Sequence, residues 1–167
     1  MSALVNEAVR NDTREYDGVP ATVTVKGHPV HPMLVNYPIA FLSGVLLFDI
    51  LSYARDSSFW ASFSYWLLVG GTAMGVAAAA AGMADFFGDR RISRLTIARL
   101  HFLGNAIVVC LSLVNLALRM NASAGPVSLS WLMLSAVVVL LISGTGWLGG
   151  EMVYRHRIGM IPRGTHE

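Results

Sequence analysis

The side chains of this chain that are able to bind a metal or cofactor gather at the predicted ends of its long apolar segments. Histidine is the most informative of them, because imidazole is a common ligand of iron and zinc. Four of the five histidines and two carboxylates fall near segment ends that the charge pattern assigns to one side of a membrane: His28, His31, His101, His156, Asp85 and Glu151. Ionisable groups at this depth are costly unless they are paired or ligated, so this cluster is the first candidate for a functional site.

Four apolar segments must position these side chains. They cover Met33–Ala54, Phe59–Ala84, Leu95–Leu118 and Leu129–Val153. Each reaches the roughly 20 residues that an α-helix needs to cross the hydrocarbon core. The whole chain of 167 residues is 54% hydrophobic and 13% charged, which is far from the composition of soluble domains. The loops are short, so neighbouring helices run antiparallel, and the predicted fold is all-α: an integral membrane, up-down four-helix bundle.

The basic residues predict the orientation of this bundle. Ten of the twelve Lys and Arg residues lie before the first segment, between the second and third, or after the fourth. Only Arg55 and Arg119 fall in the other two loops. The positive-inside rule therefore places both termini in the cytoplasm of a multi-pass protein. This topology explains the basic balance of the chain without a nucleic-acid partner, and the single cysteine excludes a disulfide framework.

Three parts are expected along the chain. Residues 1–27 are predicted to form a polar cytoplasmic tail with a short β-prone patch at Ala21–Val25, residues 28–160 the transmembrane domain, and residues 161–167 a C-terminal tail. The sequence contains no Gly-rich phosphate loop and no serine elbow. A non-catalytic subunit is therefore favoured over an enzyme.

The first helix carries ionisable residues at both ends. His28-Pro29-Val30-His31-Pro32 precedes it, and because proline suits the first turn of a helix, the helix is predicted to begin at Pro32 with His31 as its N-cap. Pro38 should bend the helix. Heptad steps place one face toward the bundle: His31, Val35, Pro38, Leu42, Val45, Asp49 and Ser52. Asp49 lies toward the outer end, where Asn115 or Arg119 is its expected partner in a structural ion pair.

The other helices also have distinctive faces. The second carries a stripe of small residues that ends in a carboxylate, Gly71, Gly75, Ala78, Gly82 and Asp85; the third carries a polar stripe, His101, Asn105, Val108, Ser112 and Asn115. The fourth has Gly146 and Gly150 directly before Glu151. Small residues let helices approach closely in lipid, and glycine faces of this kind also allow a homo-oligomer.

Four motifs together resemble one known family. They are His28-Pro29-Val30-His31-Pro32, Gly82-Met83-Ala84-Asp85, His101 with Asn105, and Gly146-Trp147-Leu148-Gly149-Gly150-Glu151-Met152-Val153-Tyr154. The combination resembles the bacterial membrane family called domain of unknown function 2231, over about residues 26–160. One position departs from the family pattern, because Arg157 stands where glycine usually follows the C-terminal histidine. The resemblance implies the bacterial inner membrane and, because family members occur fused to Rieske iron–sulfur or cytochrome c domains, a role in electron transfer with such a partner.

Haem b is the first interpretation of the histidines. Membrane four-helix cytochromes hold haem iron between two imidazoles from facing helices, and His31 and His101 each lie on an inward face. His28 and His156 are further candidates around the cofactor, and basic residues near the cytoplasmic ends, among them Arg94 and Arg99, suit its propionates. Four residues are candidates to support the ligands: Asp85, Glu151, Asn105 and Tyr154.

Two other interpretations stay open at this point. The same histidines and carboxylates suit a non-haem iron or zinc site, whose ligands would include His31 and His101. Alternatively, the polar groups bond only to one another and to interfacial water, and the domain is a structural anchor for a redox partner. The three interpretations differ in whether the purified protein carries haem, another metal, or neither.

Overall fold

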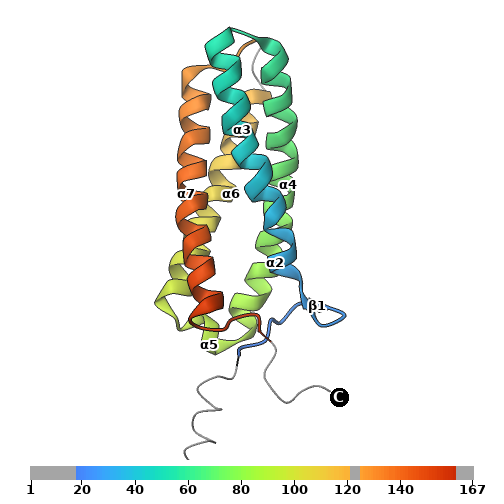
Figure 1. The fold of residues 1–167 in the computed structure, drawn as a ribbon, viewed down its shortest axis with the longest axis vertical. Coiled ribbons are helices and arrows are strands. Elements are labelled where there is room, and N and C mark those ends of the chain that lie inside the picture. The colour runs from blue at the N-terminus through green and yellow to red at the C-terminus, as the bar shows by residue number, and fades with distance from the viewer. Residues whose placement is uncertain (1–17, 121–124, 161–167) are drawn as a thin grey trace, which may run out of the picture.

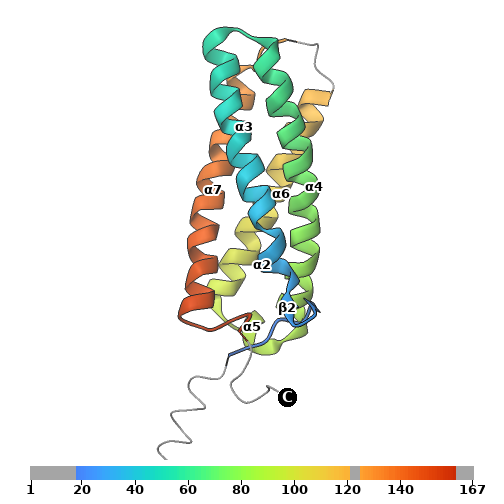
Figure 2. The ribbon, with the colours of Figure 1, turned by 45° about the vertical axis from the view of Figure 1, so that its right-hand side comes forward.

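The structure is a computed structural model that describes residues 18–120 and 125–160, and long antiparallel helices dominate it (Figure 1). The helices are α2 (Val30–Leu34), α3 (Asn36–Arg55), α4 (Ser58–Gly88), α5 (Arg90–Ser93), α6 (Thr96–Met120) and α7 (Leu129–Tyr154). Four helical stretches are long and apolar enough to cross a membrane, with α2 and α3 forming one of them. The predicted all-α bundle is therefore confirmed. Both views show α3 beside α4 and α6 beside α7, so that two helix pairs face each other (Figure 2).

The first spanning stretch is interrupted at Val35, between α2 and α3. Pro38 explains the interruption, because it has no N–H to donate to the carbonyl one turn back and its ring crowds that carbonyl. The predicted start of the helix was wrong, however. α2 begins at Val30 with Pro29 at its N-cap, so His31 lies inside the first turn. Pro32 is tolerated there because the first N–H groups of a helix have no partner within the helix.

The predicted inward faces are confirmed. The buried residues of α3 are Leu42, Val45, Asp49 and Ser52, all of them on the predicted heptad face. The middle of the bundle is an apolar cluster of buried residues from all four long helices, made of Leu42, Val45, Leu68, Val108, Val138 and Ile142. Its central position separates two polar regions at opposite ends of the bundle.

The outer polar region is a closed network around the buried ion pair of Asp49 and Arg119. The Nη2 atom of Arg119 lies 2.7 Å from Oδ2 of Asp49, and Nη1 lies 3.0 Å from Oδ1. The exposed fractions of these residues are 0% for Asp49 and 8% for Arg119. Ser64 and Ser135 also donate to the carboxylate, and Asn115 accepts from Nε of Arg119 at 2.9 Å. The partner predicted for Asp49 is confirmed, and the network joins α3, α4, α6 and α7.

At the other end, segments far apart in the sequence are tied together. Val19 pairs with Ile158, and the N–H of Gly159 donates to the carbonyl of Val19 at 2.8 Å. A small hairpin, β1 (Thr24–Val25) with β2 (His28–Pro29), leads into α2. The segment before β1 thus contacts the helical domain through Val19, Thr22 and Val23, while residues 1–17 and 161–167 of the two predicted tails lie outside the described residues.

The connection between α4 and α6 contains the short helix α5. Asp89 is its N-cap, and its carboxylate accepts from the backbone N–H of Arg91 at 2.7 Å. The side-chain and backbone hydrogen bonds from Arg91 lower the pKa of the Asp89 carboxyl. The sequence analysis had treated this connection as a plain loop.

Candidate functional site

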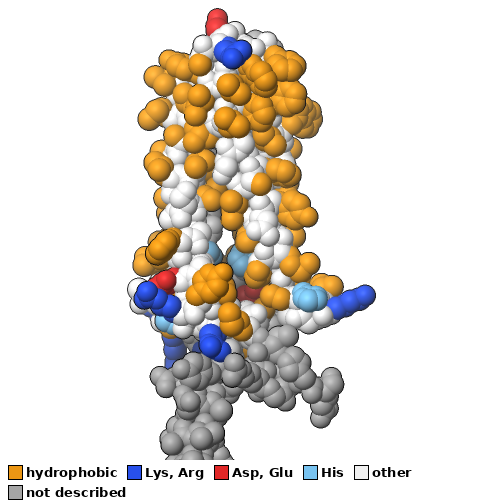
Figure 3. Space-filling view, viewed as in Figure 1, with side chains coloured by type: hydrophobic (Ala, Val, Ile, Leu, Met, Phe, Trp, Pro, Cys, Tyr) orange, Lys and Arg blue, Asp and Glu red, His pale blue; other side chains and the backbone are white. Residues whose placement is uncertain are grey.

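A cavity of about 440 Å³ lies between the two helix pairs, in the half of the bundle opposite the Asp49–Arg119 network. Residues of α2, α3, α4, α6 and α7 line it, and both predicted ligands, His31 and His101, are among them. Figure 3 shows a hollow on the face between α7 and the first spanning stretch, with histidine side chains visible inside. The cavity therefore has polar groups within it and faces the surroundings of the bundle laterally.

His31 is held against the backbone of α4. Its Nδ1 atom lies 2.8 Å from the carbonyl oxygen of Ala78, and because a carbonyl only accepts, Nδ1 must carry the hydrogen. Gly82, four residues after Ala78, makes this approach feasible, since a Cβ at that position would lie 2.9 Å from two ring atoms of His31. The Nε2 atom of His31 is left with its lone pair, which is the form that ligates a metal.

His101 repeats this arrangement on the other helix pair. Its Nδ1 atom donates to the carbonyl of Thr145 at 2.9 Å, and a Cβ on Gly149, again four residues later, would lie 3.1 Å from the ring. The sequence analysis missed this internal repeat. Its signal is a glycine four residues after the accepting carbonyl on both helices, but that spacing is common and becomes informative only when the facing histidine is known.

The two imidazoles are neighbours across the cavity. The ring centroids of His31 and His101 lie 6.3 Å apart, with the ring planes at 88°. Asn105, predicted to support the ligands, contacts His101 directly: its Nδ2 lies 3.2 Å from Nε2 of His101 and donates to the His101 carbonyl at 2.8 Å. The hydroxyl of Thr145 donates to Oδ1 of Asn105 at 3.3 Å, which fixes the orientation of the amide. Asn105 is therefore a donor toward Nε2 of His101.

The two predicted carboxylates have other partners. Oδ1 of Asp85 accepts the backbone N–H groups of Thr22 and Val23, at 2.7 and 3.1 Å, and so anchors the segment before β1. Glu151 forms an i,i+4 ion pair with Arg155 at 2.9 Å. Neither carboxylate has a described hydrogen bond to a histidine.

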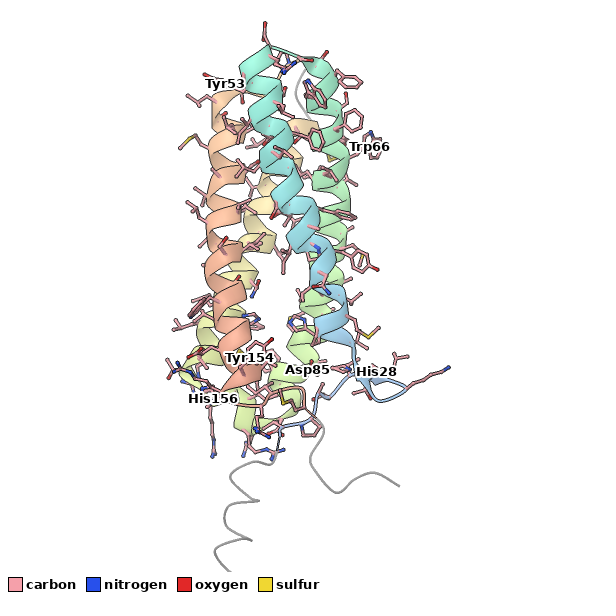
Figure 4. All side chains as sticks on the ribbon, viewed as in Figure 1. His28, Tyr53, Trp66, Asp85, Tyr154 and His156 are labelled. Carbon is pink, nitrogen blue, oxygen red and sulfur yellow. The ribbon has the colours of Figure 1, made fainter. Side chains whose placement is uncertain are left out.

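The remaining predicted site residues lie at the surface of the same end (Figure 4). His28 and His156 are exposed, and the side chain of Tyr154 borders the cavity although the residue is 83% exposed. Arg94 and Arg99 are exposed between α5 and the start of α6, and Nε of Arg99 donates to the carbonyl of Ser93 at 2.8 Å. The structure thus brings together His31, His101 and Asn105, and leaves the others around the mouth of the bundle.

The number of possible metal ligands in the cavity limits which metal the site can bind. Within residues 18–120 and 125–160, no group of three or more His, Cys, Asp or Glu side chains is placed to share a metal ion. Asp85 also lines the cavity but is not placed to share an ion with both histidines, so the donors that lie together are the two imidazoles. This set is too small for a protein-only zinc or iron site, which takes three or four protein ligands.

Fold and site together define a class: a four-helix membrane protein whose inner half encloses a cavity with a pair of backbone-anchored histidines. The chain belongs to the family described as predicted membrane protein (DUF2231), which it matches over residues 27–162. The expected family is thereby confirmed. No curated protein and no solved structure matches the chain. The departure at Arg157 does not remove the turn, because Arg157 adopts the left-handed conformation with φ of 52°.

Proposed function

We propose that the cavity binds one b-type haem between His31 and His101, and that the protein is an electron-transfer subunit of the membrane. The separation of the two imidazoles carries this proposal. An ion that lies on the axis between the two rings, bonded to one nitrogen of each at the usual distance of about 2 Å, would place the ring centroids about 6 Å apart. The observed distance is 6.3 Å.

The number of protein ligands favours haem over a non-haem metal. A porphyrin supplies four nitrogens, so the protein has to add only two axial ligands, whereas zinc and non-haem iron need three or more protein groups. The hydrogen bonds from Nδ1 of His31 and His101 to carbonyls also suit axial ligands, since they fix the tautomer and the ring orientation.

The walls of the cavity support a flat ligand. It lies between two helix pairs, and its volume of about 440 Å³ is in the range of cofactor sites, roughly 300–1,000 Å³. Gly146 and Gly150 line it, and a Cβ at either position would meet nothing within 4 Å. The packing of the helices within the chain therefore does not require glycine at these two positions.

Haem, when bound, supplies reversible one-electron redox chemistry. The proposed electron-transfer role follows from this property. The chain's own contribution is to hold the imidazoles at a fixed separation and to surround them with apolar side chains. Exposed Arg94 and Arg99, near the start of α6, are the basic groups we assign to the propionates. We propose a bacterial inner-membrane location and a Rieske or cytochrome c type protein as redox partner, as in the fused members of the family.

The test is a reduced-minus-oxidised visible spectrum of the detergent-purified protein, with metal analysis of the same sample. Wild type should show a sharp α band and a Soret shift, and both should be lost in His31→Ala and in His101→Ala. His28→Ala is the matched control, because His28 is exposed on β2 and should leave the spectrum unchanged. An unaltered Soret band in His101→Ala would overturn the ligand assignment, and a colourless, metal-free wild type would leave the structural anchor as the function.

A further inference from the structure

Two hydroxyl groups in the middle of the bundle lack partners. Among the described residues, Oγ1 of Thr72 and Oγ of Ser112 are the buried side-chain N or O atoms without a hydrogen bond. Thr72 is 4% exposed and Ser112 is 1% exposed. An unpaired buried hydroxyl is costly in a protein interior, and such groups usually mark a missing water or ligand. Both residues line the same cavity as the histidines.

These hydroxyls form a separate end of the cavity, here called the deep end. Thr72 precedes Ala78, the carbonyl partner of His31, by six residues, which is about 9 Å along α4. Ser112 follows His101 by eleven residues, about 16 Å along α6. The apolar cluster containing Leu42 and Val108 borders the deep end, and the Asp49–Arg119 network has its own complete set of partners. The two hydroxyls are therefore not part of either polar region described above.

The chemistry of the deep end limits its ligand. Besides the two hydroxyls, its lining is apolar and small, with Leu42, Gly71 and Gly75 among the residues. No charged side chain is described there to balance a charged ligand, and an unpaired charge at this depth is strongly disfavoured. Two hydroxyls are suitable donors for one neutral oxygen acceptor. Gly71 packs closely against Leu42, and Gly75 lies between Pro38 and Val109, so the space beside the two hydroxyls is narrow.

We propose that the deep end binds a carbonyl oxygen of a lipid-soluble quinone. A quinone is flat, neutral and apolar apart from its two oxygens, and it partitions into the depth of the membrane where Thr72 and Ser112 lie. The cavity that Thr72 and Ser112 line opens laterally at the hollow between α7 and the first spanning stretch, where histidine side chains are visible (Figure 3). This binding goes beyond the proposed haem site, because none of its contacts requires haem.

The experiment measures binding of a decyl-substituted benzoquinone to the full chain in lipid nanodiscs, by titration and by labelling with an azido derivative. Saturable binding is expected in wild type, with label on α4 or α6. Thr72→Val and Ser112→Ala should each raise Kd about threefold to tenfold, as expected for one lost hydrogen bond. Ser143→Ala is the matched control, because its exposed hydroxyl only donates to the carbonyl of Val139 in its own helix.

The outcomes separate this proposal from the haem proposal. Quinone binding that is weakened by the two deep-end substitutions supports the proposal, whether or not the same samples show a haem spectrum. Absence of saturable binding in wild type overturns it. Equal affinity in wild type, Thr72→Val and Ser112→Ala also overturns it, and then water is the partner of the two hydroxyls.

Discussion

The two polar regions of this bundle are built on the same four helices but differ in how completely their groups are paired. In the outer region, Asp49 accepts from Arg119, Ser64 and Ser135, so both charges are satisfied within the chain. In the inner region, His31 and His101 use one ring nitrogen each to bond a carbonyl, and a cavity lies beside them. Polar residues within the membrane-spanning stretches therefore do not by themselves identify a ligand site, and the inner region differs in that a cavity lies beside its histidines.

The largest expected effect comes from opening the outer network. Asp49→Ala leaves the guanidinium of Arg119 buried without its carboxylate, and removing one member of a buried ion pair typically costs about 3–5 kcal/mol. We expect a large fall in the thermal midpoint in detergent, measured by circular dichroism, and poor recovery of folded protein.

A double substitution sharpens this test. Asp49→Leu with Arg119→Met removes both charges, and replacing a whole buried pair by apolar residues is often neutral or stabilising. Recovery of most of the lost stability is expected in the double variant. If Asp49→Ala alone unfolds at the wild-type temperature, the network does not hold the bundle together.

The outer network also shows which structural features can be predicted from the sequence. Asp49 lies at heptad spacing from His31, and a charge on an inward membrane face needs a partner, so the choice could be narrowed to Asn115 or Arg119 from the sequence, and the structure gives Arg119. The same reasoning gave the four spans and the inward faces. It did not give the hydrogen-bond partners of Asp85, because a carboxylate before a loop can accept from side chains or from backbone N–H groups, and only the folded position of Thr22 and Val23 decides between them.

The carbonyl partners of His31 and His101 could not be predicted from the sequence, for a similar reason. That His31 and His101 face inward followed from the pattern, but their carbonyl partners are on other helices, and the axial register of two helices is set by packing. The predicted N-cap at His31 failed because both Pro29 and Pro32 are compatible with the start of a helix. The β1–β2 hairpin, which closes through a local turn at Lys26 and Gly27, extends through Pro29 and so places that start at Val30.

An intermediate effect is expected from a methyl group placed against a histidine ring. In Gly82→Ala the new Cβ would lie 2.9 Å from the ring of His31, so the ring must move away from the carbonyl of Ala78. We expect haem affinity, measured by titrating the apoprotein with hemin, to fall at least about tenfold, as is typical when an orienting contact of a metal ligand is lost.

Gly144→Ala is the matched control, because Gly144 is exposed on α7 outside the cavity lining and a Cβ there meets nothing within 4 Å. Alanine favours a helix over glycine by roughly 0.5–1 kcal/mol, so this variant should be slightly more stable and bind hemin as wild type does. Equal affinity of the Gly82→Ala and Gly144→Ala variants would show that the fit of the ring against α4 does not position the ligand.

The smallest effect is expected at Asn105, whose amide already contacts Nε2 of His101, the predicted ligand atom. Nδ2 of Asn105 lies 3.2 Å from Nε2 of His101, so in the proposed complex it would compete with iron for the lone pair of that nitrogen. In Asn105→Ala this competition is removed, and the hydroxyl of Thr145 keeps its bond to the carbonyl of Ile142 at 3.2 Å. Hemin affinity should therefore rise about twofold to tenfold, the range of one ordinary hydrogen bond.

The same substitution in the outer region should give the opposite pattern. Asn115 lies on α6 as well, but it accepts from Nε of Arg119 and donates to Ser135, so its loss leaves the buried Nε of Arg119 without an acceptor. Asn115→Ala should lower stability by about 1–3 kcal/mol and leave hemin affinity unchanged. A fall in hemin affinity in Asn105→Ala would show instead that the amide stabilises the ligating orientation of His101, and the difference between the two regions would then be smaller than we infer.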